Sequence, residues 1–174
     1  MQERDKVLAL LKDTLVRVNS WLTFAETKNA ALLGFNVALI AFAYKLKVDK
    51  ESKLLLSIVF VVCLGIVLLA FLSLCPKLLK YRPPKTRLTD SDKQKSNLLF
   101  FGDIKRFTEC DYVKEVYKRY LDKEIRMNEI SRLELDIAQE IIVNAYIAYR
   151  KYELFRIACF AELVSVGLLM KIIM

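Results

Sequence analysis

Residues 54–75, LLLSIVFVVCLGIVLLAFLSLC, determine how the rest of the chain has to be interpreted. The stretch contains no charged residue and no proline, and its only hydroxyl side chains are Ser57 and Ser73. A helix of about 22 residues is about 33 Å long, which is close to the roughly 30 Å hydrocarbon core of a bilayer. Its many β-branched residues also suit a buried strand, but such strands run only about 4–8 residues. The stretch therefore predicts a membrane-spanning helix.

Composition agrees with a membrane protein that also has a polar domain. The 174 residues are 55% hydrophobic and 28% charged, and the formal net charge is +8. The apolar and charged residues are segregated along the chain, as expected for spans joined to a polar domain. Anionic lipid headgroups and the excess of positive charge on the cytoplasmic side explain most of the net charge, so we expect no nucleic-acid polymer as a partner.

The residue types that carry most enzyme chemistry are missing or scattered. The chain has no histidine, which excludes imidazole metal sites and Ser-His-Asp triads. Its four glycines form no phosphate-binding loop. The cysteines lie far apart without a CxxC motif and are interpreted as reduced thiols: Cys63, Cys75, Cys110 and Cys159. We therefore expect no enzyme activity, no metal and no cofactor.

The segments before residue 54 are predicted to be helical as well. Residues 1–28 carry apolar side chains at three-and-four spacing, which predicts an amphipathic helix on the membrane surface or against a partner helix. Residues 29–44 are uncharged but short for a span, unless the flanking lysines snorkel or the bilayer thins. With the polar turn 45–53, residues 29–75 are predicted to form a two-span hairpin. Asn36, near the middle of the first span, either bonds to another helix or lines a pore.

Residues 76–153 are predicted to form a helical cytoplasmic domain. The domain opens with a basic stretch that contains three prolines, and its charge favours the cytoplasmic side. Residues 90–96 are interpreted as a solvated linker. From residue 111 to about residue 150 the chain lacks glycine and proline, and its nearly heptad apolar stripe predicts one long helix. We expect that helix to pack against the apolar patch 97–107, a second subunit, or both.

Residues 154–174 are predicted to form a third span. Arg156, Glu162 and Lys171 interrupt the apolar run, and the two basic side chains can snorkel to opposite faces. Glu162 cannot, and an acidic group at that depth costs several kcal/mol unless it is paired, protonated or facing water. A half-buried amphipathic helix is the alternative for this segment.

Two groups of residues are candidates for function. The first lies within the predicted spans, where Asn36 and Glu162 combine with small residues that let helices approach closely. The second is cytoplasmic and basic, next to aromatic rings that can stack a base while the cations hold a phosphate. We expect three of its members, Arg119, Lys123 and Arg126, to share a helix face. The alternative is a charged surface beside an aromatic core. The candidate ligand-binding residues are Lys105, Arg106, Tyr112, Arg119, Lys123 and Arg126.

Residues 97–102, NLLFFG, followed by a tyrosine at the start of the helical part, resemble the transmembrane effectors of Pycsar antiphage systems. Members of that family also carry an acidic residue followed by Lys-Ala before the first span. Here that motif reads ETKNA from residue 26, so Glu replaces the usual Asp and Asn29 the usual Ala. The resemblance covers roughly residues 15–172. The positions that match its motifs are Glu26, Lys28, Asn97, Phe100, Phe101, Gly102, Tyr112, Asn144, Lys151, Tyr152 and Arg156.

The resemblance implies a toxic membrane effector. In such systems a nucleotidyl cyclase senses infection, and the effector then assembles in the inner membrane and impairs its integrity. Effectors of this kind often carry a separate cyclic-nucleotide-binding domain, for which 174 residues leave no room. Either the 76–153 region senses the signal itself, therefore, or another chain does.

We predict an all-α, multi-pass protein of the bacterial inner membrane, with its N-terminus and its 76–153 domain cytoplasmic. The expected partners are the lipid bilayer, further copies of the chain, and a cyclic nucleotide or a separate sensor chain. Asn36 and Glu162 are the residues predicted to carry the membrane activity, and the motif-matched positions hold the fold or couple the domain to the membrane. The alternative function is a non-toxic membrane anchor that recruits a soluble partner through its cytoplasmic helix.

Overall fold

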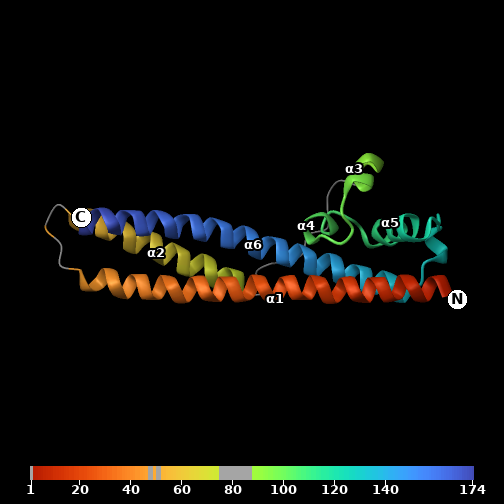
Figure 1. Ribbon diagram of the computed structural model, residues 1–174, viewed down its shortest axis with the longest axis horizontal. Helices are drawn as coiled ribbons and strands as arrows, with labels where there is room; N and C mark the ends of the chain where they lie inside the picture. Colours follow the sequence, from red (N-terminus) through yellow and green to blue (C-terminus); the bar gives the residue numbers. More distant parts are fainter. Residues whose placement is uncertain (1, 47–48, 50–51, 75–87) are drawn as a thin grey trace. The chain divides into compact units, whose positions relative to one another are not determined.

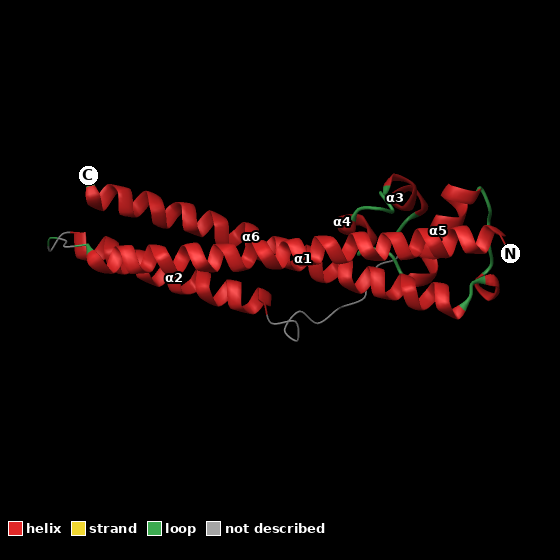
Figure 2. Cartoon of the chain, turned by 60° about the horizontal axis from the view of Figure 1, so that its bottom comes forward, coloured by secondary structure: helices red, strands yellow, loops and turns green. Residues whose placement is uncertain are grey.

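A computed structural model describes residues 2–46, 49, 52–74 and 88–174, and all regular secondary structure in them is helical (Figures 1 and 2). The all-α class is thereby confirmed. Residues 47, 48, 50 and 51 of the predicted turn 45–53 lie outside the described residues, and so does most of the proline-containing basic stretch. The elements are α1 (Gln2–Lys45), α2 (Ser52–Leu74), α3 (Asp90–Lys95), α4 (Phe101–Ile104), α5 (Glu109–Leu121), a 3₁₀ turn η2 (Met127–Glu129) and α6 (Arg132–Ile173).

The chain divides into two compact units, which are described separately. The first, here called the polar unit, comprises Met1–Thr23 and Tyr81–Tyr149. The second, here called the apolar unit, comprises Phe24–Lys80 and Arg150–Met174. Helices α1 and α6 each contribute residues to both units.

The predicted N-terminal amphipathic helix and first span form one uninterrupted helix, α1, of 44 residues. No break in secondary structure marks the predicted boundary at residue 28, and the two compact units divide α1 between Thr23 and Phe24. Polar side chains are accommodated inside the helix because they bond back to it: Ser20 donates to the carbonyl of Val16 at 3.0 Å, and Asn29 to that of Ala25 at 2.8 Å. Such local bonds satisfy the side chain without ending the helix.

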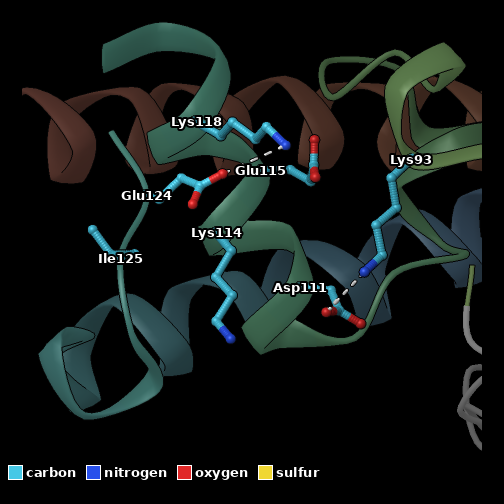
Figure 3. A pocket seen from close by; sticks show the side chains of 7 residues that line it. All are labelled: Lys93, Asp111, Lys114, Glu115, Lys118, Glu124 and Ile125. Carbon is cyan, nitrogen blue, oxygen red and sulfur yellow. Dashed lines mark hydrogen bonds and ion pairs between the residues drawn. The ribbon is translucent and has the colours of Figure 1, made fainter. Parts of the chain in front are cut away.

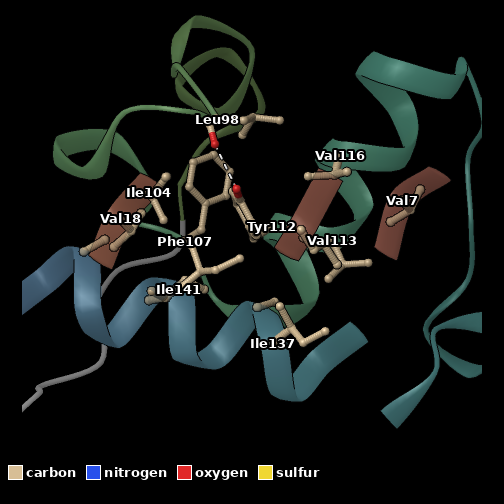
Figure 4. Close-up of a cluster of buried hydrophobic side chains, with 14 of the residues drawn as sticks. Val7, Val18, Leu98, Ile104, Phe107, Tyr112, Val113, Val116, Ile137 and Ile141 are labelled. Carbon is tan, nitrogen blue, oxygen red and sulfur yellow. Dashed lines mark hydrogen bonds between the residues drawn. The ribbon is translucent and has the colours of Figure 1, made fainter. Parts of the chain in front are cut away.

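The core of the polar unit is built from α1, α5, the first half of α6 and the segment around α4 (Figure 4). The Tyr112 side chain lies at its centre and is 1% exposed. Its hydroxyl donates to the carbonyl oxygen of Leu98 at 2.8 Å, so the buried oxygen has a partner. Each large apolar side chain buried here contributes about 1.5–3 kcal/mol to folding. Members of this core include Val7, Leu11, Val18, Ile104, Phe107, Val113, Val116, Ile137 and Ile141.

The prediction of one helix from residue 111 to about residue 150 is wrong. Helix α5 ends at Leu121 because Asp122 adopts the left-handed conformation, with φ 50° and ψ 40°. Aspartate tolerates this conformation better than most residues, so the chain turns without glycine. A new helix starts after Ser131, whose hydroxyl accepts from the Glu134 N–H at 3.2 Å while its own N–H donates to the Glu134 carboxylate at 2.6 Å. This reciprocal arrangement is a capping box.

Residues 90–96 are mostly solvated as predicted, with no buried residue in α3, but they form this helix and not a linker. Thr89 begins the helix by accepting a hydrogen bond from the Asp92 N–H at 3.2 Å. Lys93 then pairs with Asp111 at 3.2 Å. Arg119 donates to the carbonyl of Ser96 at 2.6 Å and also to that of Lys93. The short helix is therefore fastened to α5.

Helix α2 is the element closest to the predicted span 54–75, and it is long and apolar enough to cross a membrane. Only 22% of its apolar window is buried, which leaves most of its surface without protein cover. Among the described residues, no other helix passes the same test of length and composition. Two apolar clusters nevertheless join α2 to segments of α1 and α6: Ala43, Val59, Cys63 and Leu169 in one, and Leu32, Ile66 and Ala158 in the other.

Candidate functional site: a buried amide–carboxyl pair in the apolar unit

The most unusual feature of the apolar unit is a buried contact between Asn36 of α1 and Glu162 of α6. Asn36 is 0% and Glu162 4% exposed, and the Asn36 Nδ2 donates to the Glu162 Oε2 at 2.6 Å. Polar groups buried in apolar surroundings destabilise a protein unless they are hydrogen-bonded, and charged groups do so most. The two residues that the sequence singles out for membrane activity are thus brought together, one helix supplying the partner for the other.

This pair does not satisfy all of its own polar atoms. The Asn36 Oδ1 and the Glu162 Oε1 have no hydrogen-bond partner among the described residues. Two further buried side chains of the apolar unit are Ser165 of α6, whose hydroxyl donates to the Ala161 carbonyl at 3.1 Å, and Cys63 of α2. Among the described residues, these two oxygens of Asn36 and Glu162 are therefore hydrogen-bond acceptors without a donor inside the apolar unit.

A second polar contact in the apolar unit joins the same two helices. Lys151 is 1% exposed, and its Nζ lies 2.6 Å from the Glu26 Oε1. Asn29 donates to the Lys151 backbone carbonyl at 3.5 Å. The Lys28 ammonium lies over three aromatic rings, one of them that of Tyr152. Four motif-matched positions, Glu26, Lys28, Lys151 and Tyr152, therefore hold α1 against α6.

The other motif-matched positions are mostly structural within the polar unit. The Asn97 Oδ1 accepts from the Leu99 N–H at 2.9 Å, and Asn144 donates to Asn19 at 2.9 Å. Phe100 and Phe101 pack on each other with ring centroids 4.7 Å apart. A Cβ at Gly102 would lie 2.4 Å from a Phe100 ring carbon, so glycine leaves space for that ring.

Tyr112, which opens the helical part in the motif, is the buried core residue already described, and burial raises the pKa of its hydroxyl. In the apolar unit, Arg156 makes an exposed pair with Glu153 at 3.0 Å.

The six predicted ligand-binding residues do not converge on one site. Because the chain turns at Asp122, Arg119, Lys123 and Arg126 do not share a helix face, and that expectation is wrong. Lys105 lies over the Tyr149 ring, and Arg106 is exposed. The remaining four have separate local roles: Tyr112 is buried, Arg119 binds the α3 carbonyls, Lys123 pairs with Glu3 at 2.8 Å, and Arg126 precedes η2.

Two clefts in the polar unit were not foreseen from the sequence. One, of about 210 Å³, is lined by three lysines, three acidic side chains and Ile125 (Figure 3). Its charges compensate each other, as in the Lys93–Asp111 pair at 3.2 Å and the Lys118–Glu124 pair at 3.9 Å. The other, of about 300 Å³, is lined by Glu3, Arg4, Tyr117, Lys123, Ile125 and Glu129. Neither contains an excess of positive charge that would select a phosphate.

Glu134 is the buried acidic residue that the sequence reasoning missed. Its side chain is 0% exposed, yet it accepts from the Tyr117 hydroxyl at 2.7 Å and from the Ser131 hydroxyl at 2.7 Å. Burial opposes ionisation, but these hydrogen bonds, the Ser131 N–H and the Arg4 charge outweigh it, so the pKa of Glu134 lies below its ordinary value. For Tyr117, burial and the bond to this carboxylate raise the pKa. The Ser-x-x-Glu spacing was the available signal.

All regular structure in the described residues is helical, and one exposed helix is long and apolar enough to cross a membrane, which are features of the class of helical membrane proteins. Within that class, the chain is a member of the PycTM family, because the family model described as a Pycsar effector protein domain matches residues 10–174. The resemblance found in the sequence is thereby confirmed, and the protein is an effector of antiphage defence. No curated protein and no solved structure matches the chain.

Proposed function

We propose that this effector acts by opening a water path across the bacterial inner membrane, and that Asn36 and Glu162 line that path when it is open. The action is non-catalytic and involves several copies of the chain. In the closed state the amide and the carboxyl group bond to each other at 2.6 Å within the bundle. Separation of α1 from α6 would expose both groups to water, where they are well solvated.

The observation that carries the proposal is the buried carboxyl group itself. A membrane anchor has no need of Glu162, and an acidic group within a span costs several kcal/mol unless it is paired or facing water. Glu162 is 4% exposed and has one oxygen paired with Asn36 and one without a partner among the described residues. A residue kept at such a cost is by default a functional candidate.

The trigger is proposed to be a cyclic nucleotide or a separate sensor chain. Three of the predicted basic residues are engaged in local contacts of the polar unit: Arg119 with α3 carbonyls, Lys123 with Glu3 and Lys105 with Tyr149. A ligand that bound any one of these cations would have to displace the partner of that residue. Displacement of such a partner is the way in which the trigger is proposed to change the packing of the polar unit.

The proposal is tested by recording membrane potential and growth of bacteria that express the chain from an inducible promoter. One arm contains the chain alone, and the other also contains an enzyme that produces a cyclic nucleotide. Depolarisation only with the enzyme indicates a sensor in this chain, whereas depolarisation without it indicates a toxin that a partner restrains. No depolarisation in either arm, with the protein verified in the membrane, contradicts the proposal and favours the anchor.

The same assay is repeated with Glu162→Leu and Asn36→Leu. We expect each variant to reduce the rate of depolarisation at least about tenfold, since a loss of about 1.4 kcal/mol of polar stabilisation in the open path changes a rate tenfold. Ser57→Leu is the matched control, because the Ser57 hydroxyl is exposed and bonds only to its own helix at Lys53. If both the Asn36 and the Glu162 variants depolarise the membrane at the wild-type rate, the pair has no part in the mechanism.

A further inference from the structure

We propose that Lys28 is a fixed binding site for the phosphate of an anionic phospholipid headgroup. The Lys28 Nζ lies 4.6 Å from the ring centroid of Phe24, 5.6 Å from that of Tyr152 and 5.5 Å from that of Phe155. All four residues belong to the apolar unit, the lysine and Phe24 on α1 and the other two rings on α6. The proposal does not depend on whether the bundle conducts.

The three rings fix the position of the ammonium group. Each cation–π contact within about 6 Å is worth about 0.5–1 kcal/mol at an exposed site. Lysine otherwise loses much rotamer freedom when it binds a ligand, and here the rings have already restricted the side chain. Lys28 is therefore a preorganised cation rather than a freely moving one.

The protein does not neutralise that cation. The carboxylate nearest in sequence, Glu26, pairs with the buried Lys151 at 2.6 Å. Glu153, next to the Tyr152 ring in sequence, pairs with Arg156 at 3.0 Å. Among the residues that the structure describes, no carboxylate forms an ion pair with Lys28. An ammonium held by π faces alone still has N–H donors for an anionic oxygen.

The lipid headgroup is the anion that fits this place in the chain. Lys28 directly precedes the uncharged residues 29–44, so in the topology predicted from the sequence it stands where the chain enters the hydrocarbon. Aromatic rings are enriched at this level of a membrane, and the Phe24 ring is 53% exposed, available to the glycerol and upper acyl region. A phosphodiester without an ammonium group of its own, as in phosphatidylglycerol, leaves its full charge for Lys28. Phosphatidylcholine does not, because its choline offsets that charge.

The test measures thermal unfolding of the full chain in a neutral maltoside detergent by circular dichroism. Phosphatidylglycerol, phosphatidylcholine or inorganic phosphate is added at equal phosphate concentration. We expect phosphatidylglycerol to raise the Tm of the wild type by about 3–5 °C more than phosphatidylcholine does, through binding to the folded state. Inorganic phosphate, which lacks the acyl and glycerol contacts, is expected to leave the Tm within about 1 °C of the lipid-free value.

Substitutions test whether the preference for phosphatidylglycerol over phosphatidylcholine depends on Lys28. Lys28→Gln is expected to remove most of the phosphatidylglycerol preference, and Lys28→Arg to keep it, because arginine retains both charge and stacking. Lys45→Gln is the matched control, a substitution of an exposed lysine at the C-terminal end of the same helix. The proposal is overturned if Lys28→Gln keeps the wild-type preference, or if Lys45→Gln loses as much.

Two further results would also overturn the proposal. Equal stabilisation by inorganic phosphate would exclude the lipid as the occupant. If Lys28→Gln does not fold, the same Tm measurement is made on Phe24→Leu, which removes the ring nearest to Lys28 from an exposed position. We expect that variant to fold and to lose about half of the preference, and an unchanged preference would contradict the ring-held site.

Discussion

Replacement of Glu134 by Gln is expected to destabilise the polar unit strongly, although Gln has nearly the same shape. The carboxylate accepts hydrogen bonds from three donors: the Tyr117 hydroxyl at 2.7 Å, the Ser131 hydroxyl at 2.7 Å and the Ser131 N–H at 2.6 Å. Tyr117 bonds to one carboxylate oxygen and Ser131 to the other. An amide has only one accepting oxygen, so one side of the network would face an NH₂ group instead.

The magnitude follows from this count. Hydrogen bonds to a charged group are worth about 1.5–3 kcal/mol each, and losing one or two of them while leaving a donor buried costs about 2–4 kcal/mol. For a chain of this length that predicts a Tm lower by about 4–16 °C. Glu140→Gln, on the exposed face of the same helix, is the matched control and is expected to stay within about 0.5 kcal/mol of the wild type.

The dependence on pH provides a second measurement of the same network. The pKa of Glu134 in the folded protein lies below its ordinary value of 4.5. Its contribution to stability is therefore complete above that ordinary value and is lost as the pH falls through the lowered pKa of the folded state. The Tm difference between wild type and Glu134→Gln should be constant from neutral pH down to 4.5 and shrink only below it. A Tm of Glu134→Gln equal to that of Glu140→Gln at neutral pH would refute the reasoning.

Three other substitutions test contacts at motif-matched positions by thermal unfolding of the detergent-solubilised chain. Gly102→Ala is expected to cost about 1–2 kcal/mol, because its Cβ would lie 2.4 Å from the Phe100 ring and force the ring out of its aromatic contacts. Gly65→Ala meets nothing within 4 Å and should be neutral or slightly stabilising; a Gly102→Ala chain as stable as this control would contradict the steric argument. Lys151→Met and Glu26→Gln, alone and combined, should show a coupling of about 0.5–3 kcal/mol, whereas additive effects would mean that the ion pair contributes nothing.

The sequence predicted the helical class and the position of the apolar helix well, because a 22-residue uncharged run needs no tertiary information to be recognised. It failed at the turn between α5 and α6. That turn contains neither glycine nor proline, and the left-handed conformation falls on Asp122. The Ser131-x-x-Glu134 spacing is typical of a helix N-terminus and indicated the start of a new helix. The prediction of one long helix relied on the apolar periodicity instead.

The residues of the candidate site could be predicted from the sequence, but the hydrogen bond between them could not. Asn36 and Glu162 stand out because each is a polar group in an apolar run, which one sequence shows by itself. Their bond depends on how α1 and α6 are rotated and shifted against each other, and that is set by packing. The shared helix face expected for Arg119, Lys123 and Arg126 was wrong because helical spacing was assumed to continue past Asp122, where the chain turns.

The Asn36–Glu162 hydrogen bond also has a consequence for how the protein is made. The two residues are 126 positions apart in the chain. At a synthesis rate of about 5–20 residues per second, Asn36 emerges from the ribosome about 6–25 s before its partner. During that interval the Asn36 amide lacks its partner, and we expect it to remain in water, at the membrane surface or bound to another protein. The segment around Asn36 is therefore expected to take its final place only when the last helix arrives, with α2 as the segment able to insert unaided.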